Sequence, residues 1–213
     1  MPSRTQRSLY PPVCTLLLLF FVVINTPSIT TATGTELPDM VSAAGQERGV
    51  DKVLRMHGIA FHILCPNQGS LNTLTIVPSG LKEDNSAIKR EIDGSVTGVE
   101  VADLNGDGSP EVYVYINSAG SGSYGTLVAY SANKKKSLSE IYLPPLENDP
   151  ENSKGYMGHD GFRVSDGVLV RSFPVYNPGD SNATPTGGTR SLEYQLVAGE
   201  AGLRLEVIKS SMD

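Results

Sequence analysis

The chain has 213 residues, with 17 basic and 23 acidic side chains, a formal net charge of −6 and an isoelectric point near 5.1. Nucleic acid and anionic lipid repel an acidic protein, so the charge argues against these partners and favours a basic protein partner. The length fits one domain with a sizeable core, once an N-terminal segment is set aside.

The N-terminal segment has the pattern of a signal peptide. Arg4 and Arg7 precede an apolar run, 13–24, that only Thr15 interrupts. This run is as long as a signal-peptide core and short for a membrane-spanning helix. We therefore predict a signal peptide at 1–32, a flexible arm at 33–53 and an exported domain at 54–213. An uncleaved N-terminal anchor is the alternative.

Removal of the predicted signal peptide changes the charge and the cysteine content. It takes away two basic residues and no acid, which leaves 15 basic and 23 acidic residues and a net charge of −8. It also removes Cys14, so Cys65 cannot form an intrachain disulfide. Cys65 ends an apolar segment, which predicts a buried and inert thiol.

Nine short segments rich in Val, Ile, Leu or Tyr are bounded by turn residues, as β-strands are. They are 57–64, 71–77, 98–102, 111–117, 126–131, 139–143, 168–173, 191–197 and 203–208. Alternation in 111–117 puts three aliphatic side chains on one face and Tyr113 and Tyr115 on the other. Segment 86–92 fits a short helix or a strand nearly equally well. We expect an all-β protein, an antiparallel β-sandwich or barrel with short strands and at most one short helix.

The segment 118–125 lies between two predicted strands and consists of small residues and one tyrosine. Gly120, Gly122 and Gly125 match the spacing of a dinucleotide fingerprint, but a strand follows where that motif needs a helix. The segment therefore predicts a hairpin loop. Tyr124 offers a rigid ring with a polar tip, which suits an interface anchor. An ordinary flexible hairpin, with the ring folded onto the sheet, is equally compatible.

An acidic segment precedes the strand at 111–117. Asp103, Asn105, Asp107 and Glu111 place oxygen ligands at alternate positions, as calcium loops do. The twelfth position is Val114, which excludes an EF-hand because that site needs a bidentate Glu there. A tight turn closed by aspartate side chains is favoured, with calcium as the weaker alternative. No cofactor is predicted.

The motifs around the hairpin resemble a known family. Segment 104–125, which reads LNGDGSPEVYVYINSAGSGSYG, is similar to the periplasmic inhibitors of invertebrate-type (I-type) lysozyme. The resemblance continues through 131–133, 137–145, 158–160 and 185–190, and covers about 57–208. It implies a β-sandwich, a periplasmic location, a homodimer and lysozyme as the partner.

The resemblance also implies site residues. The motif Ser121-Gly122-Ser123-Tyr124 would enter the lysozyme cleft, with Ser121 and Tyr124 meeting the catalytic region. A lysozyme cleft holds two carboxyl groups, to which a serine hydroxyl can donate, and sugar subsites that a tyrosine ring can fill. A second contact is expected on the turn formed by Thr186, Gly187, Gly188, Thr189 and Arg190.

Three classes of function stay open at this point. The first is an exported lysozyme inhibitor. The second is a calcium-dependent extracellular adhesion or carbohydrate-binding module, suggested by the acidic segment. The third is a secreted hydrolase, suggested only by serine-rich loops and the pair His159-Asp160. No spacing pairs a nucleophile with a base, so we expect a protein that is not an enzyme.

Overall fold

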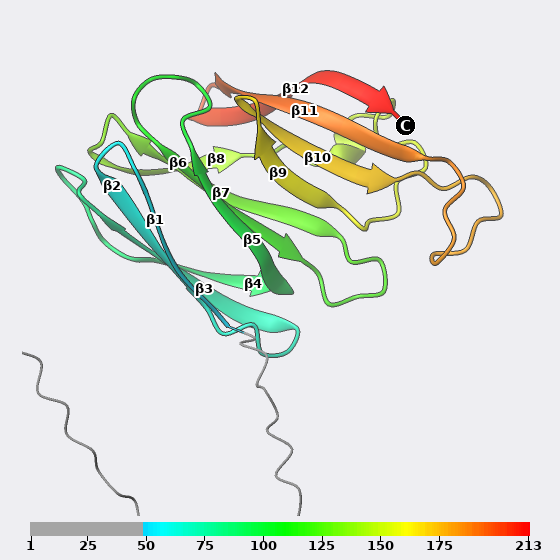
Figure 1. The fold of residues 1–213 in the computed structure, drawn as a ribbon, viewed down its shortest axis with the longest axis horizontal. Helices are drawn as coiled ribbons and strands as arrows, with labels where there is room; N and C mark the ends of the chain where they lie inside the picture. Colours follow the sequence, from blue (N-terminus) through cyan, green and yellow to red (C-terminus); the bar gives the residue numbers. More distant parts are fainter. Residues whose placement is uncertain (1–48) are drawn as a thin grey trace, which may run out of the picture. The chain divides into compact units, whose positions relative to one another are not determined.

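The computed structural model describes residues 49–213, and the predicted signal peptide and residues 33–48 lie outside this range. The described part has twelve strands and one 3-10 turn, η1 (Leu146–Asn148). The strands are β1 (Val50–Met56), β2 (Ile59–Cys65), β3 (Leu71–Ser79), β4 (Ile88–Asp93), β5 (Ser95–Ala102), β6 (Glu111–Asn117), β7 (Gly125–Asn133), β8 (Ser137–Tyr142), β9 (Gly161–Ser165), β10 (Val168–Pro174), β11 (Thr189–Ala198) and β12 (Leu203–Met212) (Figure 1).

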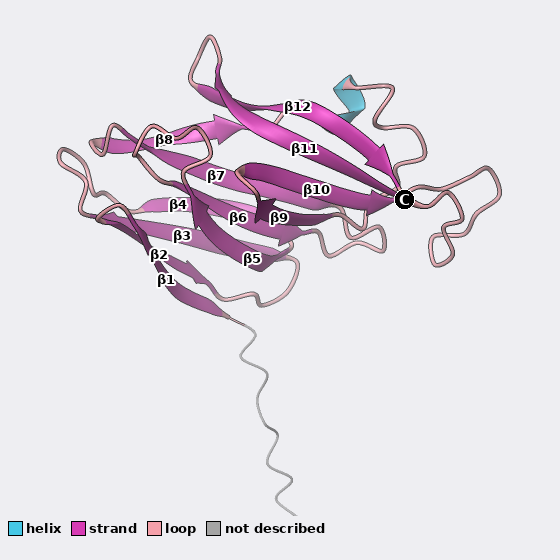
Figure 2. Ribbon diagram, turned by 45° about the horizontal axis from the view of Figure 1, so that its top comes forward, coloured by secondary structure: helices cyan, strands magenta, loops and turns pink. Residues whose placement is uncertain are grey.

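The strands form two sheets. A four-stranded sheet has the order β1-β2-β3-β4, and an eight-stranded sheet has the order β5-β6-β7-β8-β12-β11-β10-β9. All neighbours are antiparallel except β8 and β12, which pair in parallel over two residues. The larger sheet curves until β9 lies near β5, where the Glu100 carboxylate accepts a hydrogen bond from the Val164 amide at 2.5 Å (Figure 2). The predicted all-β, antiparallel, sandwich-like class is confirmed.

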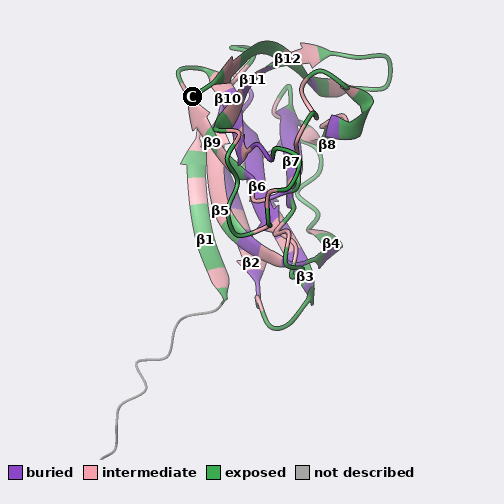
Figure 3. Ribbon diagram, turned by 90° about the vertical axis from the view of Figure 1, so that its right-hand side faces the viewer, coloured by how far each residue is buried: buried purple, intermediate pink, exposed green. Residues whose placement is uncertain are grey.

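Strand β6 separates two hydrophobic cores, and its residues are buried from Glu111 to Ile116 (Figure 3). Its aliphatic side chains pack into a core with the four-stranded sheet, which includes Phe61, Ile63, Leu74, Ile76, Val112, Val114 and Ile116. Its tyrosines fill the inside of the curved sheet, with Leu169, Phe173, Leu192, Tyr194 and Leu205. The predicted alternation is confirmed, and both faces are apolar because both are covered.

The structure corrects the sequence predictions at three strands. β1, β4 and β9 were not among the nine predicted segments, and the segment with the helical alternative forms β4. The predicted arm at 33–53 extends too far, because β1 begins at Val50 and pairs with β2 as far as Cys65. Cys65 is 2% exposed and free, as predicted. Among residues 49–213, no helix is long and apolar enough to span a membrane.

Candidate functional site

The loop between β6 and β7 is a closed hairpin tip that presents one aromatic ring. The Ser118 amide donates to the Tyr124 carbonyl at 3.0 Å, and the Tyr124 amide donates back to the Ser118 hydroxyl at 3.0 Å. Inside this closure, the Ser123 amide donates to the Gly120 carbonyl at 2.9 Å. Ser121 is exposed, and residue Tyr124 is 46% exposed. The predicted hairpin loop therefore exists, with a fixed backbone and a ring open to a partner.

Two other segments hold this loop from the side. The His159 amide donates to the Gly122 carbonyl at 2.8 Å, and the Asn182 side-chain amide donates to the Ser121 carbonyl at 2.8 Å. Nε2 of His159 lies 3.3 Å from Oδ1 of Asn182, which links the two segments to each other. The β6–β7 loop, the stretch before β9 and the β10–β11 loop thus gather at one end of the domain (Figure 1).

Gly158 makes the close approach of the second segment possible. Its φ is +93°, a left-handed conformation that residues with a side chain rarely adopt. A Cβ at this position would overlap the Gly122 carbonyl oxygen. The segment 158–160 can therefore lie directly against the hairpin loop only with glycine at this position.

A buried ion pair lies beneath the loop. The Asp160 side chain is 0% exposed, and Nε of Arg171 donates to its Oδ1 at 2.5 Å. Its other oxygen, Oδ2, accepts from the Tyr156 hydroxyl at 2.6 Å and from the Gly125 amide at 2.8 Å. Burial and the hydrogen bond to Asp160 raise the pKa of Tyr156, so its hydroxyl stays a proton donor. The first residue of β7 is therefore attached to a charged group in the core.

The ring of Tyr156 connects this ion pair to the exposed tyrosine. Tyr124 meets it edge to face, with ring centroids 5.6 Å apart and planes at 78°. Tyr156 in turn meets Phe173 at 4.8 Å, and the Arg171 guanidinium lies 5.1 Å from the Tyr156 ring centre. The exposed ring thus rests on a stack that continues into the core.

A groove begins beside Tyr124. β7 and β8 pair only over Tyr130–Asn133 and Ser137–Glu140, after which β8 leaves β7 to pair with β12. The opening holds a cavity of about 390 Å³, lined among others by Tyr124, Thr126, Leu127, Tyr142, Pro144, Pro145 and Tyr156. A groove with both apolar and charged lining, including Glu140, Glu147 and Arg171, therefore adjoins the exposed ring.

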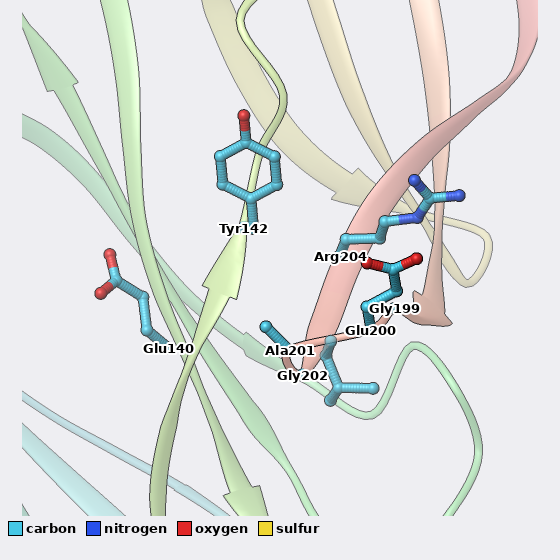
Figure 4. Close-up of a pocket in the computed structure, with 8 residues that line it drawn as sticks. Glu140, Tyr142, Gly199, Glu200, Ala201, Gly202 and Arg204 are labelled. Carbon is cyan, nitrogen blue, oxygen red and sulfur yellow. The ribbon is translucent and has the colours of Figure 1, made fainter.

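A second pocket, of about 350 Å³, lies away from the hairpin loop, between β8 and the turn joining β11 to β12. Figure 4 shows Glu140 and Tyr142 on one side of it and Glu200 and Arg204 on the other. Leu203, Ala201 and two glycines complete the lining. This set has no serine, cysteine or histidine, so the Ser–His or Cys–His pair that a serine or cysteine hydrolase uses is absent from this pocket.

The acidic segment folds into a loop whose carboxylates converge. Ligand oxygens of Asp103, Asp107 and Glu111 lie within 4.8 Å of one another. Asp103 accepts from the amides of Asp107 at 3.1 Å and Gly108 at 2.9 Å, as in the predicted turn, and Asn105 also accepts from the Asp107 amide at 3.1 Å. Burial, reinforced by the charge of Asp103, raises the pKa of Glu111 to about 7. These carboxylates are close enough to bind one cation together, and backbone amides of the same loop also donate hydrogen bonds to Asp103.

The expected second contact is bonded to other parts of the chain. Thr186 binds the Asp180 carboxylate, Gly187 and Gly188 pair with Val175, Thr189 pairs with Asp213, and Arg190 donates to the Glu151 carbonyl at 2.7 Å. The contact from this loop to the hairpin is made by Asn182. Thr186 and Thr189 remain exposed, so their role toward a partner stays a prediction.

The hairpin loop lies inside the segment that a family model matches. Residues 66–151 match the periplasmic lysozyme inhibitor of I-type lysozyme. This match confirms the resemblance predicted from the sequence and the predicted periplasmic or secreted location. It implies an inhibitor of I-type lysozyme, which agrees with the expectation of a protein that is not an enzyme. No curated protein matches the chain.

The match includes the hairpin loop and the acidic segment, and it ends before Tyr156, Asp160 and Arg171. These three residues were not predicted as part of the inhibitory site, and the His159-Asp160 pair was considered only as a hint of a hydrolase. A signal was present in β10, since Arg171 lies between Leu169 and Phe173 on the inward face. A buried arginine needs an acidic partner, which the sequence alone does not identify.

Proposed function

We propose that the protein inhibits I-type lysozyme by inserting the β6–β7 hairpin loop into the enzyme's active-site cleft. The observation that carries this proposal is the exposed Tyr124 ring on a closed hairpin tip, within the segment that matches the family. Small residues flank the ring on both sides, so the tip is narrow enough for a groove.

The chemistry of the tip suits a glycosidase cleft. Such a cleft places two carboxyl groups about the scissile bond. The exposed Ser121 hydroxyl can donate to a carboxylate or accept from a protonated acid. The Tyr124 ring can occupy a sugar subsite, where its edge and hydroxyl replace a substrate's apolar and polar surface. Insertion would therefore block substrate without any reaction by the inhibitor.

Competition with a cleft ligand tests this mechanism. The full mature chain is mixed with an I-type lysozyme, and binding is measured with and without a chitin oligosaccharide that fills the cleft. The proposal predicts that the oligosaccharide displaces the inhibitor in proportion to its occupancy. A ternary complex of enzyme, oligosaccharide and inhibitor with unchanged affinity would contradict insertion into the cleft.

A calcium-dependent adhesion or carbohydrate-binding module is the second candidate. It is favoured by one observation, the convergence of the carboxylates of Asp103, Asp107 and Glu111. Thermal melts with calcium and with a chelator separate the candidates. A melting temperature that rises with calcium would support the module, while equal melts would leave the inhibitor as the better proposal. The homodimer that the resemblance implies stays a prediction, which light scattering of the mature chain tests.

A further inference from the structure

We propose that Asp160, Arg171 and Tyr156 form a positioning unit that fixes the hairpin loop in its binding conformation before lysozyme arrives. This inference rests on the proposed function of the loop and concerns residues outside the matched segment. The three residues do not contact the partner themselves; they act through Tyr124 and through the backbone at Gly125.

The first step is the attachment of the backbone. The Gly125 amide, where the loop returns to the sheet, donates to Oδ2 of Asp160 at 2.8 Å. A Cβ at Gly125 would overlap Cβ of Asp160, so only glycine lets the amide come so close. The loop's last residue is thereby held by a carboxylate that is 0% exposed.

The second step is the rigidity of that carboxylate. Asp160 is held on both oxygens, by Nε of Arg171 at 2.5 Å and by the Tyr156 hydroxyl at 2.6 Å. Arg171 also donates to the Tyr156 hydroxyl at 2.8 Å, which closes a triangle. Hydrogen bonds between buried charged groups are strong and directional, so the position of Asp160 is well determined.

The third step is the support of the ring. Tyr124 rests edge to face on Tyr156, and Tyr156 is held by its hydroxyl and by Phe173. The ring that would enter the cleft therefore has a fixed orientation at its base. Ordering a loop in advance lowers the entropy cost of binding, so loss of this support should weaken the complex.

The test is a double-mutant cycle between Tyr156→Phe and Tyr124→Ala, with binding to I-type lysozyme measured for each variant. Tyr156→Phe removes only the hydroxyl and keeps the ring under Tyr124. It should weaken binding about tenfold in the otherwise unchanged chain, since a charged hydrogen bond is lost. In the Tyr124→Ala background the same change should have a much smaller effect, because the contact through the Tyr124 ring is already lost and only the one through the Gly125 amide remains. Amide exchange at Gly125 should become faster in Tyr156→Phe.

Glu100→Gln is the matched control. Glu100 also bridges a tyrosine hydroxyl, that of Tyr115 at 2.7 Å, and a backbone amide, that of Val164 at 2.5 Å. Neither of these bonds goes to the hairpin loop, so Glu100→Gln should change stability and leave binding unchanged. Asp160→Asn should weaken binding more than Tyr156→Phe does, provided that the Asp160→Asn variant folds. If it does not fold, Tyr156→Phe alone tests the proposal.

Three contrary results are distinguishable. If Tyr124→Ala weakens binding while Tyr156→Phe binds as the unchanged chain does, the positioning unit is wrong and the proposed function stands. If Tyr124→Ala itself binds normally, the loop does not enter the cleft, and both proposals fall. An effect of Tyr156→Phe that persists fully in the Tyr124→Ala background would also overturn the positioning role.

Discussion

The rings of Tyr124 and Tyr156 meet edge to face with centroids 5.6 Å apart, although the two residues are 32 positions apart in the sequence, and both rings line the same groove. Tyr124 is 46% exposed, while the hydroxyl of Tyr156 is hydrogen bonded to both members of the buried ion pair. The exposed ring is thus the outer end of a continuous stack. This relationship separates the residue expected to touch lysozyme from the residues expected to hold it.

Tyr124→Ala should weaken inhibition by about 2 kcal/mol or more, because it removes a central aromatic anchor. Ser121→Ala should cost less, since it removes one hydroxyl and no ring. Calorimetric titration of lysozyme with each variant measures both. Ile208→Ala is the control, because Ile208 is a comparably exposed apolar residue on β12. Tight binding by Tyr124→Ala, or an equal loss in Ile208→Ala, would disprove the assignment.

Gly158→Ala should weaken inhibition strongly, because its Cβ would push against the Gly122 carbonyl of the hairpin loop. The left-handed backbone at φ +93° adds strain of about 1 kcal/mol for a residue with a side chain. Gly167→Ala separates the two effects. Gly167 has φ +78°, and no atom lies within 4 Å of the position that its Cβ would take, so this variant carries the strain without the overlap. Equal inhibition by both variants would show that the contact at Gly122 is unimportant.

Glu111 should make the fold less stable as the pH rises. Burial raises its pKa from 4.5 to about 7, so between these values the folded chain keeps a proton that the unfolded chain has lost. Stability from this group therefore falls from pH 4.5 to 7 and is constant above, for a total of about 3 kcal/mol. Glu111→Gln should remove this slope. Urea melts from pH 4 to 8 measure the difference, and parallel curves for the two chains would contradict the shift.

Asn182→Ala should weaken inhibition more than Thr186→Ala at equal stability. Asn182 donates to the Ser121 carbonyl at 2.8 Å, whereas Thr186 binds Asp180 within its own loop. Loss of the Asn182 bond should free one side of the hairpin at a cost of about 1 kcal/mol. Inhibition assays on both variants, with thermal melts beside them, give the comparison. A larger loss in Thr186→Ala would instead favour the predicted second contact at 186–190.

The sequence predicted those parts of the fold that local periodicity determines. Strand β6 was predicted with its bounds, because strict alternation and flanking turn residues define it. β4 was ambiguous because Ile88 and Ile92 are four residues apart, a spacing that puts them on one face of a helix and also of a strand. β1 was missed because it is an edge strand with three charged residues and weak alternation.

The site was predictable to the same extent. The hairpin loop was found because it is local, bounded by two clear strands and rich in glycine and serine. The ion pair between Asp160 and Arg171 joins a loop to the inner face of β10. Hydrophobic periodicity describes local structure and therefore does not predict such a long-range contact. From the sequence, only the inward position of Arg171 could be inferred. That position indicates that Arg171 needs an acidic partner, but it does not identify which residue this is.

The most direct measurement is lysis of bacterial cell walls by an I-type lysozyme in the presence of the mature chain, with chicken-type and goose-type lysozymes as controls. We predict stoichiometric inhibition of the I-type enzyme, lost in Tyr124→Ala, with no comparable effect on the other two. Full lysis by all three enzymes in the presence of folded protein would contradict the proposed function.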